Sequence, residues 1–167
     1  MIAIKLTNHK NFMNALLRTD VFDHFLLQEA TIAAAATYHI DGRMSREYYT
    51  QEEIDELGIA GYPCLPYGML RNTCFDLIKG KKTPSAFNFV LMLSPDNLAK
   101  TLASLGSTFT IHDIGALFIN LRFADGIMML TTGVSYRTFQ LDKSLDGQWD
   151  HLIQKFLDKH EIAFEIL

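Results

Sequence analysis

The stretch from Gly115 to Leu141 constrains the fold most, because it predicts a β-hairpin. Leu117, Ile119, Leu121 and Phe123 fall on one face at a period of two, which is typical of a strand lying over a core. Asp125-Gly126 then separates this run from a second apolar run, and an Asp-Gly pair in that position is a strong hairpin signal. Gly133 interrupts the second run, so we expect a bulge or break there, with a further strand from Tyr136 to Leu141.

The remaining patterns alternate between strands and capped helices. Strands are expected at residues 2–6, 22–29, 31–40, 87–93 and 163–167, and helices at 8–18, 67–79, 95–105 and 145–157, with at most a short exposed helix from about Thr50. Residues 33–36 are four alanines, which favour a helix by propensity. The alternation on either side of them, ending at Asp41-Gly42, favours one continuous strand instead.

Together these patterns predict a single α+β domain over residues 1–167, with a mostly antiparallel sheet and about four helices. Two blocks, residues 1–43 and 85–141, share the order strand, helix, strand, strand; a connector at 44–84 separates them, and a helix at 143–160 follows. Two interpretations stay open, namely a duplicated structural unit and one domain that uses the same connection twice.

Composition excludes several classes of protein. Apolar residues make up 49% and charged residues 20% of the chain, so it can bury a core and should not be disordered. The net charge is −4 and the pI about 5.8, so bulk charge does not indicate a nucleic-acid or membrane binder, although a local basic face stays open. The first residues lack the pattern of a signal peptide, and we expect a cytoplasmic protein with Cys64 and Cys74 reduced and buried.

A basic turn, Lys79-Gly80-Lys81-Lys82-Thr83-Pro84, is the nearest thing to a ligand-binding motif. It is not a phosphate loop, because position 75 is Phe where that loop needs its first Gly and because the turn follows a helix. It is either a basic helix end that complements the helix dipole or a contact for phosphate or nucleic acid. The candidate ligand-binding or phosphate-binding residues are Arg43, Arg71, Lys79, Lys81 and Lys82.

No motif predicts catalysis, a metal or a cofactor. The six histidines are scattered, without the spacing of a metal site. Asp23 and His24 are adjacent, but neighbouring residues on a strand point to opposite faces. The hydroxyls of Thr131, Thr132 and Ser135 lack the Gly-x-Ser-x-Gly turn of a nucleophile elbow, so we expect no catalytic residue among them.

Several sequence phrases resemble a family of bacterial proteins classed only as a domain of unknown function. They are Phe22-Asp-His-Phe-Leu-Leu, His39-Ile-Asp-Gly-Arg43, Leu77-Ile-Lys-Gly-Lys-Lys-Thr-Pro84, Thr131-Thr-Gly133 and Thr138-Phe-Gln-Leu-Asp-Lys143 with Trp149-Asp150. The resemblance implies a bacterial cytosolic protein and carries over no activity. In architecture alone, the repeated order of strand, helix and strands is similar to the unit of DNA sliding clamps, an analogy that does not fix function.

Two functional hypotheses follow. The first is a non-enzymatic binding or scaffold protein, clamp-like and associated with nucleic acid; here Lys10, Arg18 and Lys100 should share a surface with the basic turn. The second is a small-molecule or nucleotide-binding domain, or an enzyme, with a site near Arg43, Lys79 and Lys81. A deep pocket that joins Arg43, His39 and the hydroxyls of residues 131–135 would favour an enzyme. An exposed edge of the hairpin would allow a homodimer.

Overall fold

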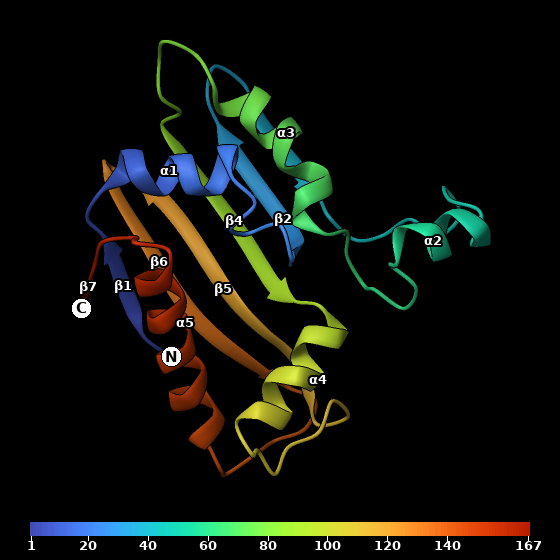
Figure 1. The fold of residues 1–167 in the computed structure, drawn as a ribbon. Helices are drawn as coiled ribbons and strands as arrows, with labels where there is room; N and C mark the ends of the chain where they lie inside the picture. Colours follow the sequence, from blue (N-terminus) through green and yellow to red (C-terminus); the bar gives the residue numbers. More distant parts are fainter.

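The computed structural model describes all of residues 1–167. The chain forms one seven-stranded sheet with helices on one face (Figure 1). The sheet has the order β3-β2-β4-β5-β6-β1-β7, and every neighbouring pair is antiparallel. The strands are β1 (Ala3–Leu6), β2 (Phe25–Ala33), β3 (Thr37–Asp41), β4 (Ala86–Leu93), β5 (Ile114–Ala124), β6 (Ile127–Tyr136) and β7 (Phe164–Ile166). The predicted α+β class with an antiparallel sheet is confirmed.

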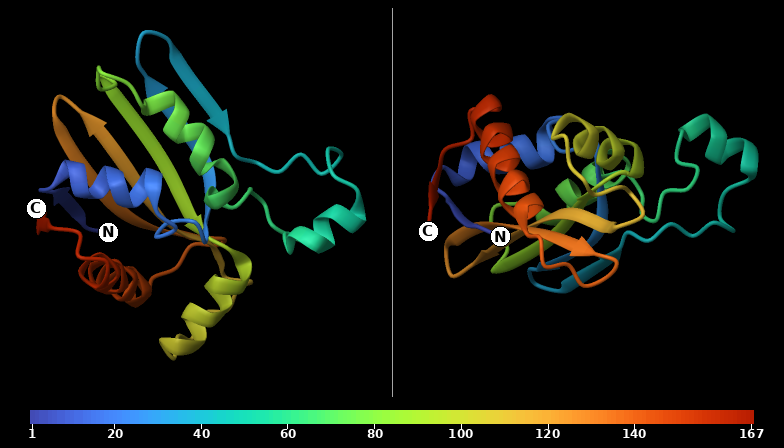
Figure 2. Two further views of the ribbon diagram at one scale, coloured as in Figure 1. Left: turned by 45° about the horizontal axis from the view of Figure 1, so that its top comes forward. Right: turned by 90° about the horizontal axis from the view of Figure 1, so that it is seen from below.

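Five helices are present, where about four were expected. They are α1 (His9–Arg18), α2 (Gln51–Leu57), α3 (Tyr67–Ile78), α4 (Pro95–Ser104) and α5 (Ser144–Lys159). Four of them cover one face of the sheet, and α2 stands away from the body at the end of an arm (Figure 2). None of the helices is both long enough and apolar enough to cross a membrane.

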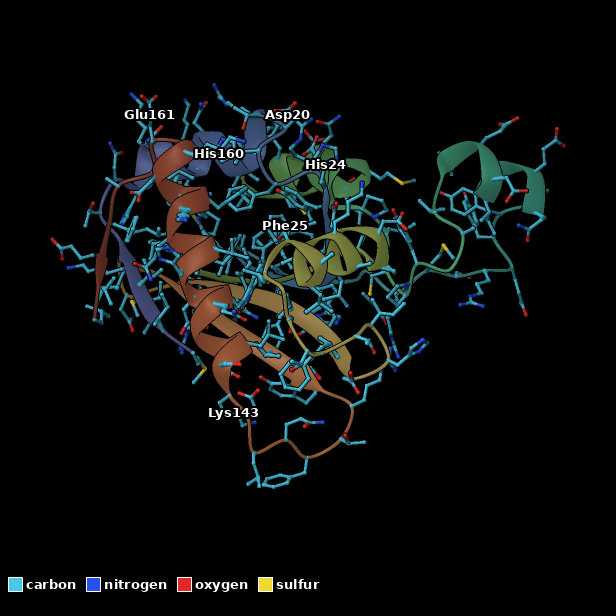
Figure 3. The ribbon with its side chains drawn as sticks, turned by 60° about the horizontal axis from the view of Figure 1, so that its bottom comes forward. Asp20, His24, Phe25, Lys143, His160 and Glu161 are labelled. Atoms are coloured by element: carbon cyan, nitrogen blue, oxygen red, sulfur yellow. The ribbon has the colours of Figure 1, made fainter.

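The core fills the space between the sheet and these four helices. It comprises 31 buried residues, and the strands contribute every second side chain, such as Leu117, Ile119 and Leu121 of β5. The helices contribute apolar side chains at spacings of three and four residues. In α5 these are Leu145, Trp149, Ile153 and Leu157. α4 and α5 lie side by side over one end of the sheet, with Phe25 between them (Figure 3).

The opposite face of the sheet carries no helix. Only the base of the arm packs there, where Tyr62 and Cys64 contact a small cluster of Leu26, Met92 and Phe118. Two hydrogen bonds close the base of the arm: the Met44 N–H donates to the Pro63 carbonyl at 3.1 Å, and the Leu65 N–H donates to that of Gly42 at 2.9 Å.

The predicted hairpin is present as β5 and β6. Asp125 (φ 53°) and Gly126 (φ 73°) form its turn, both in the left-handed region that a two-residue hairpin loop requires. The hairpin lies inside the sheet, because β4 pairs with β5 and β1 pairs with β6. The exposed hairpin edge that was expected to pair with a second copy therefore does not exist, and the free edges belong to β3 and β7.

Three details of the predicted strands are wrong. Residues 31–40 are not one strand, since the chain bends at Ala34–Ala36 and returns as β3; small side chains allow this tight reversal. Gly133 causes no break, because β6 runs through it and its missing side chain makes room for the ring of Phe118. The bulge lies on β5 at Gly115, and residues 137–141 form no strand.

The two predicted blocks pair their strands differently. In the second block, β4 and β5 on either side of α4 are direct neighbours. In the first block, β1 and β2 on either side of α1 are separated by β4, β5 and β6. The last two strands of each block do pair with each other, β2 with β3 and β5 with β6. The blocks therefore share one pairing and differ in the place of the first strand.

Candidate functional site

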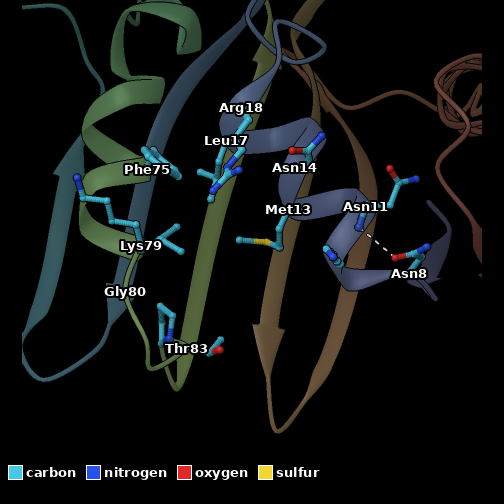
Figure 4. A pocket seen from close by; sticks show the side chains of 13 residues that line it. Asn8, Asn11, Met13, Asn14, Leu17, Arg18, Phe75, Lys79, Gly80 and Thr83 are labelled. Atoms are coloured by element: carbon cyan, nitrogen blue, oxygen red, sulfur yellow. Dashed lines mark hydrogen bonds between the residues drawn. The ribbon is translucent and has the colours of Figure 1, made fainter.

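A groove of about 670 Å³ runs between α1 and the end of α3 (Figure 4). One wall comes from α1 and the other from Phe75, Ile78 and the turn that follows α3. The residues that line it are Asn8, Lys10, Asn11, Met13, Asn14, Leu17, Arg18, Phe75, Ile78, Lys79, Gly80, Thr83 and Pro84. The groove thus joins two parts of the chain that lie more than 50 residues apart in sequence.

The sequence of α1 explains how its wall is formed. Asn8 caps the helix, and its side-chain oxygen accepts a hydrogen bond from the Asn11 N–H at 3.0 Å. Phe12 and Leu16 are fully buried on the core side of the helix. Asn8, Asn11 and Asn14 recur every three residues, so they lie along one side of α1, and that side faces the groove.

Cationic side chains enter the groove from both walls. Lys10 and Arg18 are exposed on α1, and Lys79 follows the last residue of α3. The ring of Phe75 lies between two of these cations, with Arg18 Cζ at 5.4 Å and Lys79 Nζ at 5.7 Å from its centroid. Both distances are within the range of a cation–π contact.

No acidic residue lines the groove. The nearest carboxylate that engages one of its cations is Asp76, which contacts Lys79 Nζ at 2.9 Å. Both of these side chains are more than half exposed, so water screens the pair and it adds little stability. The groove therefore presents a positive surface in a chain whose net charge is −4.

The five candidate ligand-binding residues do not gather at one place. Lys79 lines the groove, and Lys81 and Lys82 are exposed in the turn beyond it. Arg71 instead pairs with Asp23, with Arg71 Nε 2.8 Å from Asp23 Oδ1, and Arg43 pairs with Asp41 at the base of the arm. Neither arginine lines the groove.

The comparison with family models decides which family the chain belongs to. Residues 15–165 match the model of a family of unknown function, DUF5721. The chain belongs to this family. No curated protein and no solved structure matches the chain.

The DUF5721 match includes most of the groove and all of the sheet except β1 and the end of β7. Arg18, Phe75 and Lys79 fall within it, whereas Asn8, Lys10 and Asn11 precede residue 15. The resemblance noted in the sequence to a family of unknown function thus agrees with the family model.

The pocket required by the enzyme hypothesis is not formed. Thr132 faces the helices, where its hydroxyl donates a hydrogen bond to buried Asp150, whereas Thr131 lies on the opposite face of β6. His39 lies on edge strand β3, with its Nδ1 3.1 Å from Thr31 Oγ1. Arg43 is held by Asp41 at the arm. These groups therefore do not converge on one reactive position.

Sequence reasoning missed several residues of the groove. It considered Lys10 and Arg18 on α1, but it gave no role to the asparagines, to Phe75 or to Thr83. For the asparagines there is one signal in the sequence, namely the spacing of three between Asn8, Asn11 and Asn14, which places their amides along one side of a helix. That side meets the turn after α3 only in the folded chain. Lys100, by contrast, lies on α4 and outside the groove.

Proposed function

We propose that the groove between α1 and α3 binds the phosphate backbone of single-stranded nucleic acid, and that the protein acts by binding and not by catalysis. The observation that carries this proposal is an acid-free groove into which α1 brings Lys10 and Arg18 and the turn after α3 brings Lys79. Grooves of this kind, combined with an aromatic side chain, are typical of proteins that bind single strands without reading sequence.

The spacing of the cations favours a chain of phosphates over a single phosphate. Lys10 and Arg18 are eight residues apart on α1, which corresponds to ~12 Å along the helix axis. Successive phosphates of a nucleic-acid strand can contact both side chains at once. Between them, the Asn11 amide donates one hydrogen bond to the Glu161 carbonyl at 2.9 Å, and the Asn14 amide supplies a neutral donor that suits phosphate and sugar oxygens.

The lining of the groove also favours binding over catalysis. General acid–base catalysis requires a side chain such as histidine, aspartate or glutamate within hydrogen-bonding distance of the reacting group. None of these residue types lines the groove. A bound phosphodiester would therefore be held there without a histidine or a carboxylate to activate a nucleophile.

The clamp-like form of this proposal would need several copies to surround a duplex. Unequal strand pairing in the two blocks gives that form no support, and the hairpin offers no free edge for a second copy. The groove of one chain is sufficient for the single-strand form.

A salt titration of oligonucleotide binding tests the proposal. The fluorescence anisotropy of labelled oligothymidylate would be followed from about 20 to about 200 mM salt. This range includes ~0.1 M, where salt screening of the charges changes steeply. If about three to five phosphates are contacted, log K should fall with log salt at a slope of roughly −2 to −3.5. The variant K10A/R18A/K79A should bind at least about tenfold more weakly, with the slope reduced by roughly 2.

A charge-matched variant provides the control. K100A/R137A/K155A also removes three exposed positive charges, none of which lies in the groove or in an ion pair. It should bind the oligonucleotide nearly as well as the unmodified protein. Equal losses in the two triple variants, or no salt-sensitive binding at all, would refute the proposal.

A further inference from the structure

A second hollow, of about 480 Å³, lies between α4 and α5 at the end of the sheet away from the groove. Figure 3 shows Phe25 between the two helices, with His24, Asp20 and His160 toward the same end of the hollow. Its volume is within the range of pockets that hold small molecules in proteins. We call it the α4–α5 cavity.

The walls of the α4–α5 cavity are apolar, and three of their seven apolar side chains are aromatic. They comprise Val21, Phe25, Leu93, Trp149, Leu152, Ile153 and Phe156. Phe156 contacts Phe25 edge-on, with ring centroids 5.7 Å apart, and the ring of His160 at 4.7 Å. The indole N–H of Trp149 donates to the Phe118 carbonyl at 3.0 Å, so this ring is fixed in orientation. The walls can therefore receive a flat apolar group without rearranging the core.

Polar side chains at the cavity have no partner within the protein. Asp20, His24, Asn97, Lys159 and His160 line it, and none of their side chains takes part in a hydrogen bond or an ion pair. The buried carboxylate of Asp150, by contrast, is paired with Thr132. The cavity thus combines apolar walls with uncommitted polar groups, which is the arrangement that fixes a ligand's orientation.

We propose that the α4–α5 cavity binds a small molecule with an aromatic body and a single negative charge. The body lies against Trp149 and Phe156, and the anionic group contacts Lys159 and the two histidines. Lys159 is the only lysine or arginine in the lining, and Asp20 repels anions, so one negative charge, as on a carboxylate or sulfonate, is favoured over the two of a phosphate or a dicarboxylate. The site is separate from the groove and does not depend on the function proposed for it.

Binding of 1-anilinonaphthalene-8-sulfonate, an aromatic monoanion, tests this proposal. Trp149 is the only tryptophan in the chain, so its indole N–H gives one identifiable peak in an ¹H–¹⁵N correlation spectrum. Titration of the folded protein should give saturable fluorescence with one site, together with a shift of that peak. A fluorescence increase that leaves the indole peak in place would show binding elsewhere and overturn the proposal.

Three variants place the binding site. Thr101→Phe adds a ring to the α4 wall and should abolish binding, and Lys159→Ala should raise the Kd about tenfold through loss of the charged contact. Lys155→Ala removes an exposed lysine one turn earlier on α5, outside the cavity, and should leave the Kd unchanged. If Lys155→Ala and Lys159→Ala weaken binding equally, or if Thr101→Phe folds and binds normally, the site is not this cavity.

Discussion

The ring of Phe118 covers Gly133 on the neighbouring strand so closely that a Cβ at residue 133 would lie 2.3 Å from Phe118 Cζ. The two residues are direct partners across β5 and β6. We predict that Gly133→Ala destabilises the protein by about 1 to 3 kcal/mol, because the ring must leave its packed position. The free energy of unfolding in urea measures this effect.

Two variants serve as controls for that prediction. Gly147 lies in α5 with nothing near its missing Cβ, so Gly147→Ala should stabilise the protein by about 0.5 to 1 kcal/mol. The double variant F118L/G133A should recover part of the stability lost in Gly133→Ala. If Gly133→Ala were as stable as the unmodified protein, Phe118 would not be confined over the glycine.

A second prediction concerns the buried contact between Thr132 and Asp150. The Thr132 hydroxyl donates to the Asp150 carboxylate, and its oxygen also accepts from the Ile2 N–H at 3.0 Å. Thr132→Val keeps the shape but leaves the Ile2 N–H and Asp150 Oδ1 without this partner, while Asp150 Oδ2 keeps its ion pair with the Met1 amino group at 3.2 Å. We therefore expect a loss of about 1 to 3 kcal/mol in urea unfolding. Thr131→Val, on the opposite face and without a side-chain hydrogen bond, should change stability little. Similar losses in both variants would argue against a specific contribution from the contact.

The ion pair at the base of the arm predicts a pH dependence. The guanidinium of Arg43 donates to Asp41 and, together with the Arg43 backbone N–H, lowers the pKa of Asp41 from 3.8 to about 2. A carboxyl group with a lowered folded-state pKa stabilises the fold above its unfolded pKa, and this contribution is lost as the pH falls from about 4 to about 2. Carboxyl ¹³C titration should show the pKa of Asp41 rising in Arg43→Met. Arg46→Met, which removes an unpaired arginine of the arm, should leave it unchanged.

A fourth prediction concerns the two cysteines, which are free and buried. Burial raises the pKa of the Cys74 thiol to about 11 and also raises that of Cys64. At pH 8 roughly one Cys74 thiol in a thousand would be ionised, so Ellman's reagent should react only as the protein unfolds. Both thiols should react at once in guanidinium chloride, and a cysteine introduced by Ser45→Cys on the arm should react at once in the folded protein. Rapid labelling of native Cys74 would contradict its burial.

Local signals in the sequence predicted local structure well. Asp125-Gly126 fixed the hairpin turn, since both residues adopt the left-handed conformation that few other pairs tolerate. The helix expected from residue 95 is present as α4, because Ser94 is a good N-cap and Pro95 suits the first helical position; the Ser94 hydroxyl accepts from the Asn97 N–H at 3.3 Å. These features depend on contacts within a few residues, so the sequence alone contains them.

Features that depend on distant contacts could not be predicted. A glycine in a strand favours a bulge when considered alone, but Gly133 is required by Phe118, which lies on another strand. The hairpin has no free edge, because β1 and β4 arrive from elsewhere in the chain. The groove likewise needs α1 and the turn after α3 to meet, and neither segment indicates the other.

The arm that carries α2 makes the molecule an electric dipole. Residues 44–62 contain five acidic side chains and one arginine, so the arm holds a net charge of −4, equal to that of the whole chain. The body that remains is formally neutral, and α2 projects away from α1 (Figure 1). An approaching polyanion therefore exerts a torque that turns the arm outward, and the molecule is oriented before any contact forms.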